Sequence, residues 1–185
     1  GNDGSPEMLS RLEKRIERMR LKHRHEPTIY KWQELAERYP KEFFDFIFTE
    51  GNSLIYAASW AKEKPDLSKS MKEIKDSISN KSRILRKNGI WYVDIPQEDE
   101  KETSHEGKGL IIDGKKVDLY CNFHNDWDQK VRTFTMEENS KLKIVQKAQL
   151  ITGKELEKMA VPQYFMNMFK PSIDNPHYQG YILRK

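Results

Sequence analysis

The sequence predicts a mixed α+β fold, with an N-terminal helical part, a small antiparallel sheet and a packed C-terminal helix. Three observations support this. Apolar residues recur at helical spacing as far as residue 88, β-branched and aromatic residues alternate between 90 and 151, and helical spacing returns after Thr152. We expect an expression remnant at 1–7, a basic amphipathic helical arm at 8–25 and a single domain at 26–185. Within this domain we expect helices over 28–88, strands over 90–151, and a C-terminal helix and edge strand over 152–185.

Composition limits the class of protein. Of the 185 residues, 36% are hydrophobic and 34% are charged, which predicts a small core. The aromatic residues (8 Phe, 8 Tyr and 4 Trp) nevertheless supply enough apolar area for folding. A single cysteine, Cys121, excludes an intramolecular disulfide and favours a reducing intracellular compartment, cytoplasm or nucleus. No apolar run is long enough to cross a membrane, and the net charge of +4 permits polyanionic partners.

The first expected helix, over 8–24, is amphipathic. Leu9, Leu12, Ile16 and Met19 share one face, and basic residues occupy the opposite face. That basic face is either a phosphate-binding surface or a solvated surface balanced by glutamates. Further helices are expected over 28–37, from Pro40 to Gly51, and over 53–61.

The segment 62–87 is the most basic part of the chain, with nine basic and four acidic residues. Helices over 66–77 and 79–87, ended by Asn88-Gly89, are expected here. Followed by a strand over 90–95, this order resembles a winged helix-turn-helix unit, with 79–86 as the recognition helix. A plain amphipathic helical hairpin is the alternative.

The β-rich part begins with that strand and continues through an acidic loop over 97–107, which would be a linker or a mask for a basic site. Asp113-Gly114 predicts a tight hairpin between strands over 110–112 and 117–123. Two more strands are expected over 131–136 and 141–151. Thr152 and Glu155 then form a capping box for a helix whose apolar face extends to Phe169, and an edge strand follows over 178–183.

The leading functional prediction is a non-catalytic nucleic-acid-binding domain that contacts DNA or RNA phosphates through the basic helices and the hairpin tip. No cofactor or metal is expected, because the sequence has no glycine-rich phosphate loop, no nucleotide fingerprint and no nucleophile elbow. The candidate contact residues are Lys69, Lys72, Lys75, Lys81, Arg83, Arg86, Lys87, Lys115, Lys116, Arg11, Arg15 and Arg18.

Two alternatives stay open. A protein-interaction module within a larger intracellular complex would use the N-terminal helix or the Met-rich C-terminal helix with Met159, Met166 and Met168. A Mg²⁺-dependent nuclease would use Asp94 and Asp113 as metal ligands and Lys115 to stabilise the attacked phosphate. The polar segment 124–128 is expected to be a turn rather than a metal site.

Overall fold

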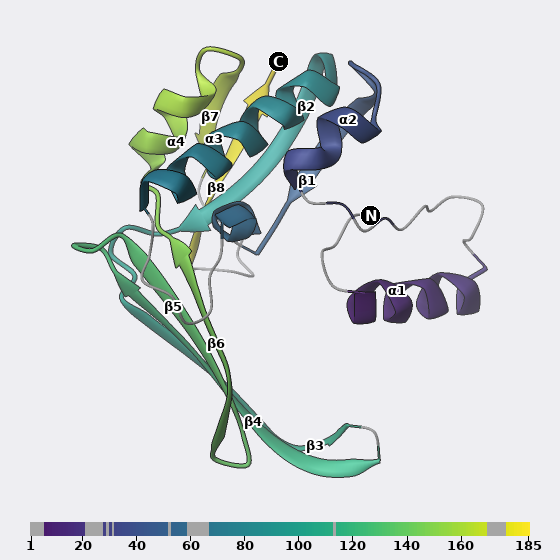
Figure 1. Cartoon of the computed structure of the whole chain (residues 1–185), viewed down its shortest axis with the longest axis vertical. Helices are drawn as coiled ribbons and strands as arrows, with labels where there is room; N and C mark the ends of the chain where they lie inside the picture. The colour runs from purple at the N-terminus through teal and green to yellow at the C-terminus, as the bar shows by residue number, and fades with distance from the viewer. Residues whose placement is uncertain are drawn as a thin grey trace.

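The chain forms two four-stranded sheets with helices packed on the first (Figure 1). This computed structural model describes residues 6–20, 28, 30, 32–51, 53–58, 67–112, 114–169 and 177–185. The helical elements are α1 (Pro6–Arg18), η2 (Trp32–Glu34), α2 (Leu35–Arg38), η3 (Ser53–Ala58), α3 (Leu67–Ile84) and α4 (Gly153–Ala160). The strands are β1 (Phe44–Thr49), β2 (Leu85–Pro96), β3 (Glu102–Ile112), β4 (Lys115–Asp126), β5 (Val131–Glu138), β6 (Lys141–Gln149), β7 (Phe165–Phe169) and β8 (Tyr178–Arg184).

The first sheet has the order β1-β2-β8-β7 and mixes parallel with antiparallel pairing. β1 and β2 are parallel, and α3 lies between them in the chain, as a parallel connection requires. β8 returns antiparallel to β2, with Trp91 opposite Leu183 and Pro96 opposite Tyr178. Trp91 and Ile95 are completely or almost completely buried, and they belong to the core cluster that α3 and α4 complete.

The second sheet is an antiparallel meander, β3-β4-β5-β6, which extends from the first sheet as a long arm (Figure 1). Ile112 pairs with Lys115 at the tip of the β3–β4 hairpin. Near this tip Gly109 adopts a φ of +64° beside a shift in register, a backbone conformation that glycine tolerates best. Two short connections join the arm to the rest of the fold: 97–101 leads from β2 into the arm, and 150–152 leads from the arm to α4.

Several sequence predictions are confirmed. The strand over 90–95 lies within β2, the hairpin lies where Asp-Gly predicts it, and β5 and β6 match the two later strands. The capping box of α4 is present, with Thr152 as the N-cap and Glu155 as its partner. The mixed α/β class is therefore correct, although the parallel pair was not foreseen.

The predicted helical hairpin over 66–87 is wrong. α3 is one continuous helix to Ile84, and β2 begins at Leu85, so no turn separates a recognition helix. Asn88 does adopt a left-handed φ of +64°, but it lies inside β2 instead of ending a helix. Because a single helix occupies Leu67–Ile84, the helix-turn-helix part of a winged-helix unit is absent from this described segment.

Four other elements differ from expectation. Phe44–Thr49, expected within a helix, is a strand that pairs with β2 at the edge of the first sheet. Its aromatic residues suit a strand as well as a helix face. The acidic loop is short, since Glu102 already begins β3. The segment with Met166 and Met168 is β7, not helix, and β8 is an internal strand. Among the helices that the structure describes, none has both the length and the apolar character needed to cross a bilayer.

Candidate functional site

The parallel strands β1 and β2 end at the same edge of the first sheet, where ligands commonly bind in open α/β sheets. Asp94, close to the end of β2, is only 3% exposed. One of its carboxylate oxygens, Oδ2, accepts a hydrogen bond from the Gly51 backbone N–H at 3.1 Å and from the Tyr92 hydroxyl at 3.5 Å. Gly51 follows β1 with a φ of +69°, so the turn after one strand is tied to the end of the next.

Arg132 enters this edge from β5 of the other sheet. Its Nη1 donates to Asn125 Oδ1 at 3.2 Å and its Nη2 donates to the Tyr178 hydroxyl at 3.3 Å. The guanidinium also lies 4.5 Å from the centre of the Phe123 ring. The side chain is buried, and its Nε has no hydrogen-bond partner. A buried cation is thus held by neutral groups at the junction of the two sheets.

A carboxylate–imidazole pair lies beside this arginine. Glu100 Oε2 is 3.2 Å from His177 Nδ1, and Glu100 Oε1 accepts from the Thr103 hydroxyl at 2.7 Å. Partial burial would raise the pKa of Glu100, but the hydrogen bonds from Thr103 and His177 outweigh burial and lower it. The Glu100 carbonyl accepts from Asn125 Nδ2 at 2.8 Å and from Trp127 Nε1 at 2.9 Å, which fixes the connection from β2 to β3.

Burial and nearby charges shift the pKa values of three tyrosines at this edge. Burial, together with the carboxylates of Asp94 and Glu50, raises the pKa of Tyr92 to about 12. Burial also raises the pKa of Tyr56 and of Tyr178, while the nearby Arg132 opposes the rise. All three phenols are therefore neutral at physiological pH. We call the following set the carboxyl-edge cluster: Tyr56, Tyr92, Asp94, Glu100, Arg132, His177 and Tyr178.

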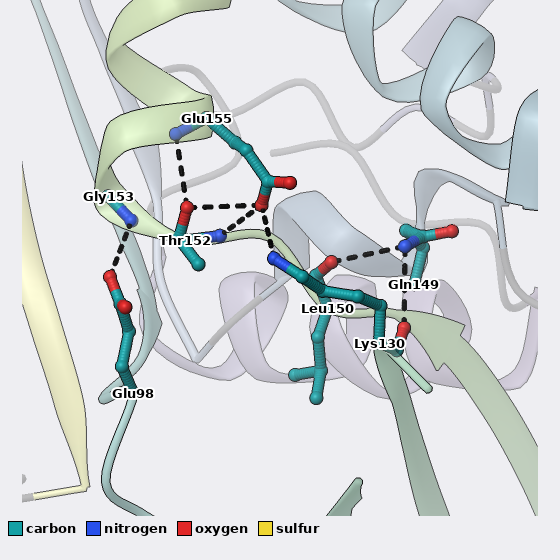
Figure 2. Close-up of polar contacts among 7 residues, drawn as sticks. All are labelled: Glu98, Lys130, Gln149, Leu150, Thr152, Gly153 and Glu155. Atoms are coloured by element: carbon teal, nitrogen blue, oxygen red, sulfur yellow. Dashed lines mark hydrogen bonds and ion pairs between the residues drawn. The ribbon is translucent and has the colours of Figure 1, made fainter. Parts of the chain in front are cut away.

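The N-terminus of α4 lies at the second connection between the sheets (Figure 2). The Glu155 backbone N–H donates to the Thr152 hydroxyl at 3.2 Å, and Glu155 Oε2 accepts from the Thr152 backbone N–H at 2.8 Å. Lys130 Nζ reaches the same carboxylate at 2.9 Å, and Glu98 accepts from the Gly153 N–H at 3.3 Å. These side chains satisfy the amide groups that would otherwise bind an anion.

The basic residues predicted to bind nucleic acid lie outside this cluster, and several are used by the fold. Lys81 is buried, with its Nζ 3.8 Å from the centre of the Trp32 ring, so it does not reach the surface. Arg83 donates to the backbone carbonyls of Ala36 and Tyr39. Arg86 forms an ion pair with Asp45 at 2.8 Å.

The remaining candidates are dispersed. Lys72 forms an exposed ion pair with Asp76. Lys115 and Lys116 lie at the tip of the arm, far along the second sheet from its junction with the first (Figure 1). The other candidates are exposed on α1, on α3 or at the start of β2, and a binding role for them stays a prediction: Arg11, Arg15, Arg18, Lys69, Lys75 and Lys87.

The proposed nuclease site is not assembled. Asp94 is in β2 of the first sheet, whereas Lys115 begins β4 at the arm tip. Asp113 lies outside the described residues. Within the described ranges, no group of three His, Cys, Asp or Glu side chains could hold a metal ion, and 124–128 forms the end of β4 and a turn.

Sequence reasoning identified Asp94 but missed Arg132 and the Glu100–His177 pair. An arginine in a strand with Phe134 and Met136 as its alternating neighbours was a usable signal, because a charge on an apolar strand face needs buried partners. No local pattern links Glu100 to His177, since the two residues meet only through tertiary structure.

The chain resembles solved S-adenosylmethionine-dependent methyltransferases along its whole length. One from Clostridium acetobutylicum has a TM-score of 0.64 at 14% identity, covering 99% of this chain and 73% of that chain. The CcbJ methyltransferase from Streptomyces caelestis has a TM-score of 0.68 at 12% identity, covering 100% and 73%. CalS10 from Micromonospora echinaspora, an amino pentose methyltransferase, has 0.65 at 9%, covering 100% and 72%. No protein-family model and no curated protein sequence matches the chain.

The fold is therefore methyltransferase-like, and this corrects the functional prediction. The prediction of a non-catalytic nucleic-acid-binding domain is wrong. The whole chain, including the basic helix α3, has a fold similar to that of methyltransferases. The expectation that the chain is more likely not an enzyme is contradicted by the same likeness in fold. Lys81, Arg83 and Arg86 misled the sequence reading because their charges contact rings, carbonyls and a carboxylate of the fold itself.

Proposed function

We propose that this chain forms the acceptor side of an S-adenosylmethionine-dependent methyltransferase, with the carboxyl-edge cluster facing the molecule that receives the methyl group. The observation that carries the proposal is the likeness to such enzymes over 99–100% of the chain, which includes both sheets. The position of the cluster supports it, because open α/β sheets bind ligands at the carboxyl ends of their parallel strands.

The acceptor that fits this edge best is an amine on a small polar molecule. The carboxylates of Asp94 and Glu50 give the side of the cluster beside the Tyr92 phenol a negative potential, and this potential attracts an ammonium group. CalS10, one of the similar structures, is an amino pentose methyltransferase. In this proposal Tyr92 and Asp94 orient the amine, and the Glu100–His177 pair accepts its proton at the imidazole.

At Gly51 and at the N-terminus of α4, the described residues offer no free backbone amide for the carboxylate of S-adenosylmethionine, the anionic group that a helix N-terminus could bind. The Gly51 N–H already donates to Asp94, and the N-terminal amides of α4 are occupied by Glu98 and Thr152 (Figure 2). The sequence contains no G-x-G-x-x-G. We therefore assign only the acceptor side to these residues.

Acceptor binding tests the proposal directly. Saturation-transfer NMR with galactosamine and an amino pentose should show contact with the wild-type chain, and glucose, which lacks the amine, should show less. Asp94→Asn and Tyr92→Phe should each reduce the signal, whereas Asp76→Asn, which alters an exposed acid on α3, should not. Thermal melts verify that the variants fold. Equal binding of glucose and the amines, or an unchanged signal in both cluster variants, would contradict the assignment.

A further inference from the structure

Hydrogen bonds from the base of the arm hold the backbone of Glu100. Asn125 Nδ2, in β4, and Trp127 Nε1, just after β4, both donate to the Glu100 carbonyl oxygen, at 2.8 Å and 2.9 Å. The two donors occupy both lone pairs of this oxygen, so the peptide group of residue 100 is fixed in orientation. The Glu100 carboxylate then accepts from the Thr103 hydroxyl at 2.7 Å, and its Oε2 is 3.2 Å from His177 Nδ1.

His177 is held from the same part of the arm, through its neighbour in the chain. The hydroxyl of Tyr178 accepts from Arg132 Nη2 at 3.3 Å. Arg132 Nη1 donates to Asn125 Oδ1 at 3.2 Å, and these two residues lie directly opposite each other in β5 and β4. The contacts therefore form a closed circuit, which we call the junction ring: His177, Glu100, Asn125, Arg132 and Tyr178.

Asn125 connects the two halves of the junction ring. Its side-chain nitrogen binds the Glu100 carbonyl, its side-chain oxygen binds Arg132, and its backbone N–H donates to the Lys101 carbonyl at 2.8 Å. Asn125 is 4% exposed and Arg132 is 2% exposed. Hydrogen bonds that are buried and share their donors and acceptors reinforce one another, so a change at Asn125 reaches both Glu100 and His177.

The contact from Glu100 decides where the imidazole proton lies. Hydrogen bonds keep Glu100 ionised at neutral pH, and a carboxylate can only accept. Nδ1 of a neutral His177 must therefore carry the proton that faces Glu100, and Nε2 carries the lone pair. When Nε2 takes a proton from an ammonium group, Nδ1 keeps its own proton and the imidazolium charge lies against the carboxylate. If the contact with Glu100 loosened, the proton could occupy either nitrogen.

We propose that Asn125 and Trp127 are positioning residues, which hold the Glu100 carbonyl so that its carboxylate stays on Nδ1 of His177 and Nε2 becomes the proton acceptor. Both residues act through Glu100. The role of His177 as a base rests on the proposed function, whereas the control of its tautomer rests on the contacts of the junction ring alone.

Nitrogen-15 NMR of the full chain, with labelled histidine and without acceptor or cofactor, tests the proposal. The shifts of the two ring nitrogens give the tautomer, and His177→Gln identifies the signals. Wild-type neutral His177 should be protonated at Nδ1. Trp127→Phe deletes one donor to the Glu100 carbonyl and should raise the share of the Nε2-protonated form by about two- to tenfold, the equilibrium effect of one hydrogen bond. Asn125→Ala should raise this share at least as much.

The matched control is Asn122→Ala, which removes an exposed hydrogen bond from β4 to Glu102 and should leave the tautomer unchanged. A carbon-13 titration of the Glu100 carboxyl gives a second readout. Burial raises its pKa, but hydrogen bonds from Thr103 and His177 prevail and lower it. This pKa should rise in Trp127→Phe, because the contact with His177 loosens.

Trp127→Phe leaves the contact between Asn125 and Arg132 in place, so it decides the question even if Asn125→Ala fails to fold. Wild-type His177 protonated mainly at Nε2 would overturn the inference. So would a folded Trp127→Phe whose tautomer and Glu100 pKa match the wild type. A tautomer that shifts as expected in a chain that binds no amine would support the positioning role and count against the proposed function.

Discussion

The Nη2 of Arg132, on β5, donates a hydrogen bond to the hydroxyl of Tyr178, on β8, across the junction of the two sheets at 3.3 Å. Two short connections join the arm to the rest of the fold, 97–101 to β2 and 150–152 to α4. The contact therefore fixes the base of the arm against the carboxyl edge, and Arg132 also fills the space between the rings of Phe123 and Tyr178.

Arg132→Ala should lower the free energy of unfolding by about 2–4 kcal/mol, because it removes a buried side chain and leaves the side-chain oxygen of Asn125, Oδ1, without the donor Nη1. Urea denaturation gives the value. Arg86→Ala, at an exposed ion pair, should change stability by less than about 1 kcal/mol. Equal losses in the two variants would mean that Arg132 does not hold the junction.

Lys81 should make stability depend on pH in the alkaline range. Burial between Trp32 and Trp91 lowers the pKa of Lys81 to about 7 in the folded chain, whereas the unfolded side chain keeps its ordinary value of 10.5. Between these values the unfolded state binds one more proton, so the free energy of unfolding rises with pH, by about 1.4 kcal/mol per pH unit at most.

Urea denaturation at a series of pH values measures this slope. Lys81→Met keeps the apolar contacts without the amine and should flatten the slope by about one proton, while Lys75→Met, exposed on the same helix, should preserve it. A wild-type slope identical to that of Lys81→Met would show that the buried amine does not titrate in this range.

The capping box of α4 should contribute measurably to stability. Thr152→Ala removes the acceptor of the Glu155 N–H and should cost about 1 kcal/mol, in contrast to Ser79→Ala on the exposed face of α3, which should cost less than about 0.5 kcal/mol.

Partial burial opposes ionisation of Glu155, but hydrogen bonds from Thr152 and Lys130 prevail and lower its pKa. Its contribution is therefore complete above the usual glutamate pKa and is lost as pH falls through the lower, folded-state value.

Chemical denaturation at neutral and acidic pH tests this. Glu155→Gln should remove part of the acid sensitivity, and a double-mutant cycle with Lys130→Met should give a coupling energy of about 0.5–1 kcal/mol for this partly exposed pair. If the stability changes of Glu155→Gln and Lys130→Met simply add, the Lys130–Glu155 ion pair drawn in Figure 2 contributes no coupling energy.

The second half of the fold was the easier half to predict from sequence. Asp113-Gly114 and Thr152 act through neighbours in the chain, so local patterns located the hairpin and the α4 cap. Phe44 and Phe48 misled because residues four apart share a helix face as well as a strand face, and only the pairing of β1 with β2 separates the two. The continuous helix α3 was split because Ser79 is a good capping residue that here lies inside a helix.

The candidate site was harder to predict than the fold. Asp94 could be noticed at the end of a strand, but its partner Gly51 comes 43 residues earlier, and Arg132 meets Tyr178 over 46 residues of separation. Lys81 shows the reverse failure. Charge counting places it with the surface lysines, whereas helical phase in α3 turns it toward Trp32 and Trp91. Composition counts charged residues but does not show whether their side chains face the solvent or the core.

Tyr92 should be the best reporter of the negative potential at the carboxyl edge. Its pKa is raised to about 12 by burial first and by the carboxylates of Asp94 and Glu50 second. Asp94→Asn should therefore bring ionisation of this phenol down toward its ordinary value without reaching it, because the burial remains. Glu50→Gln should act in the same direction.

Ultraviolet pH titration, with Tyr92→Phe to identify the signal, measures this shift. Lys116→Gln, at the distant arm tip, serves as the control and should leave the Tyr92 titration unchanged. A Tyr92 pKa that does not respond to Asp94→Asn would mean that burial alone sets it, and the electrostatic reason for preferring an amine acceptor would be lost.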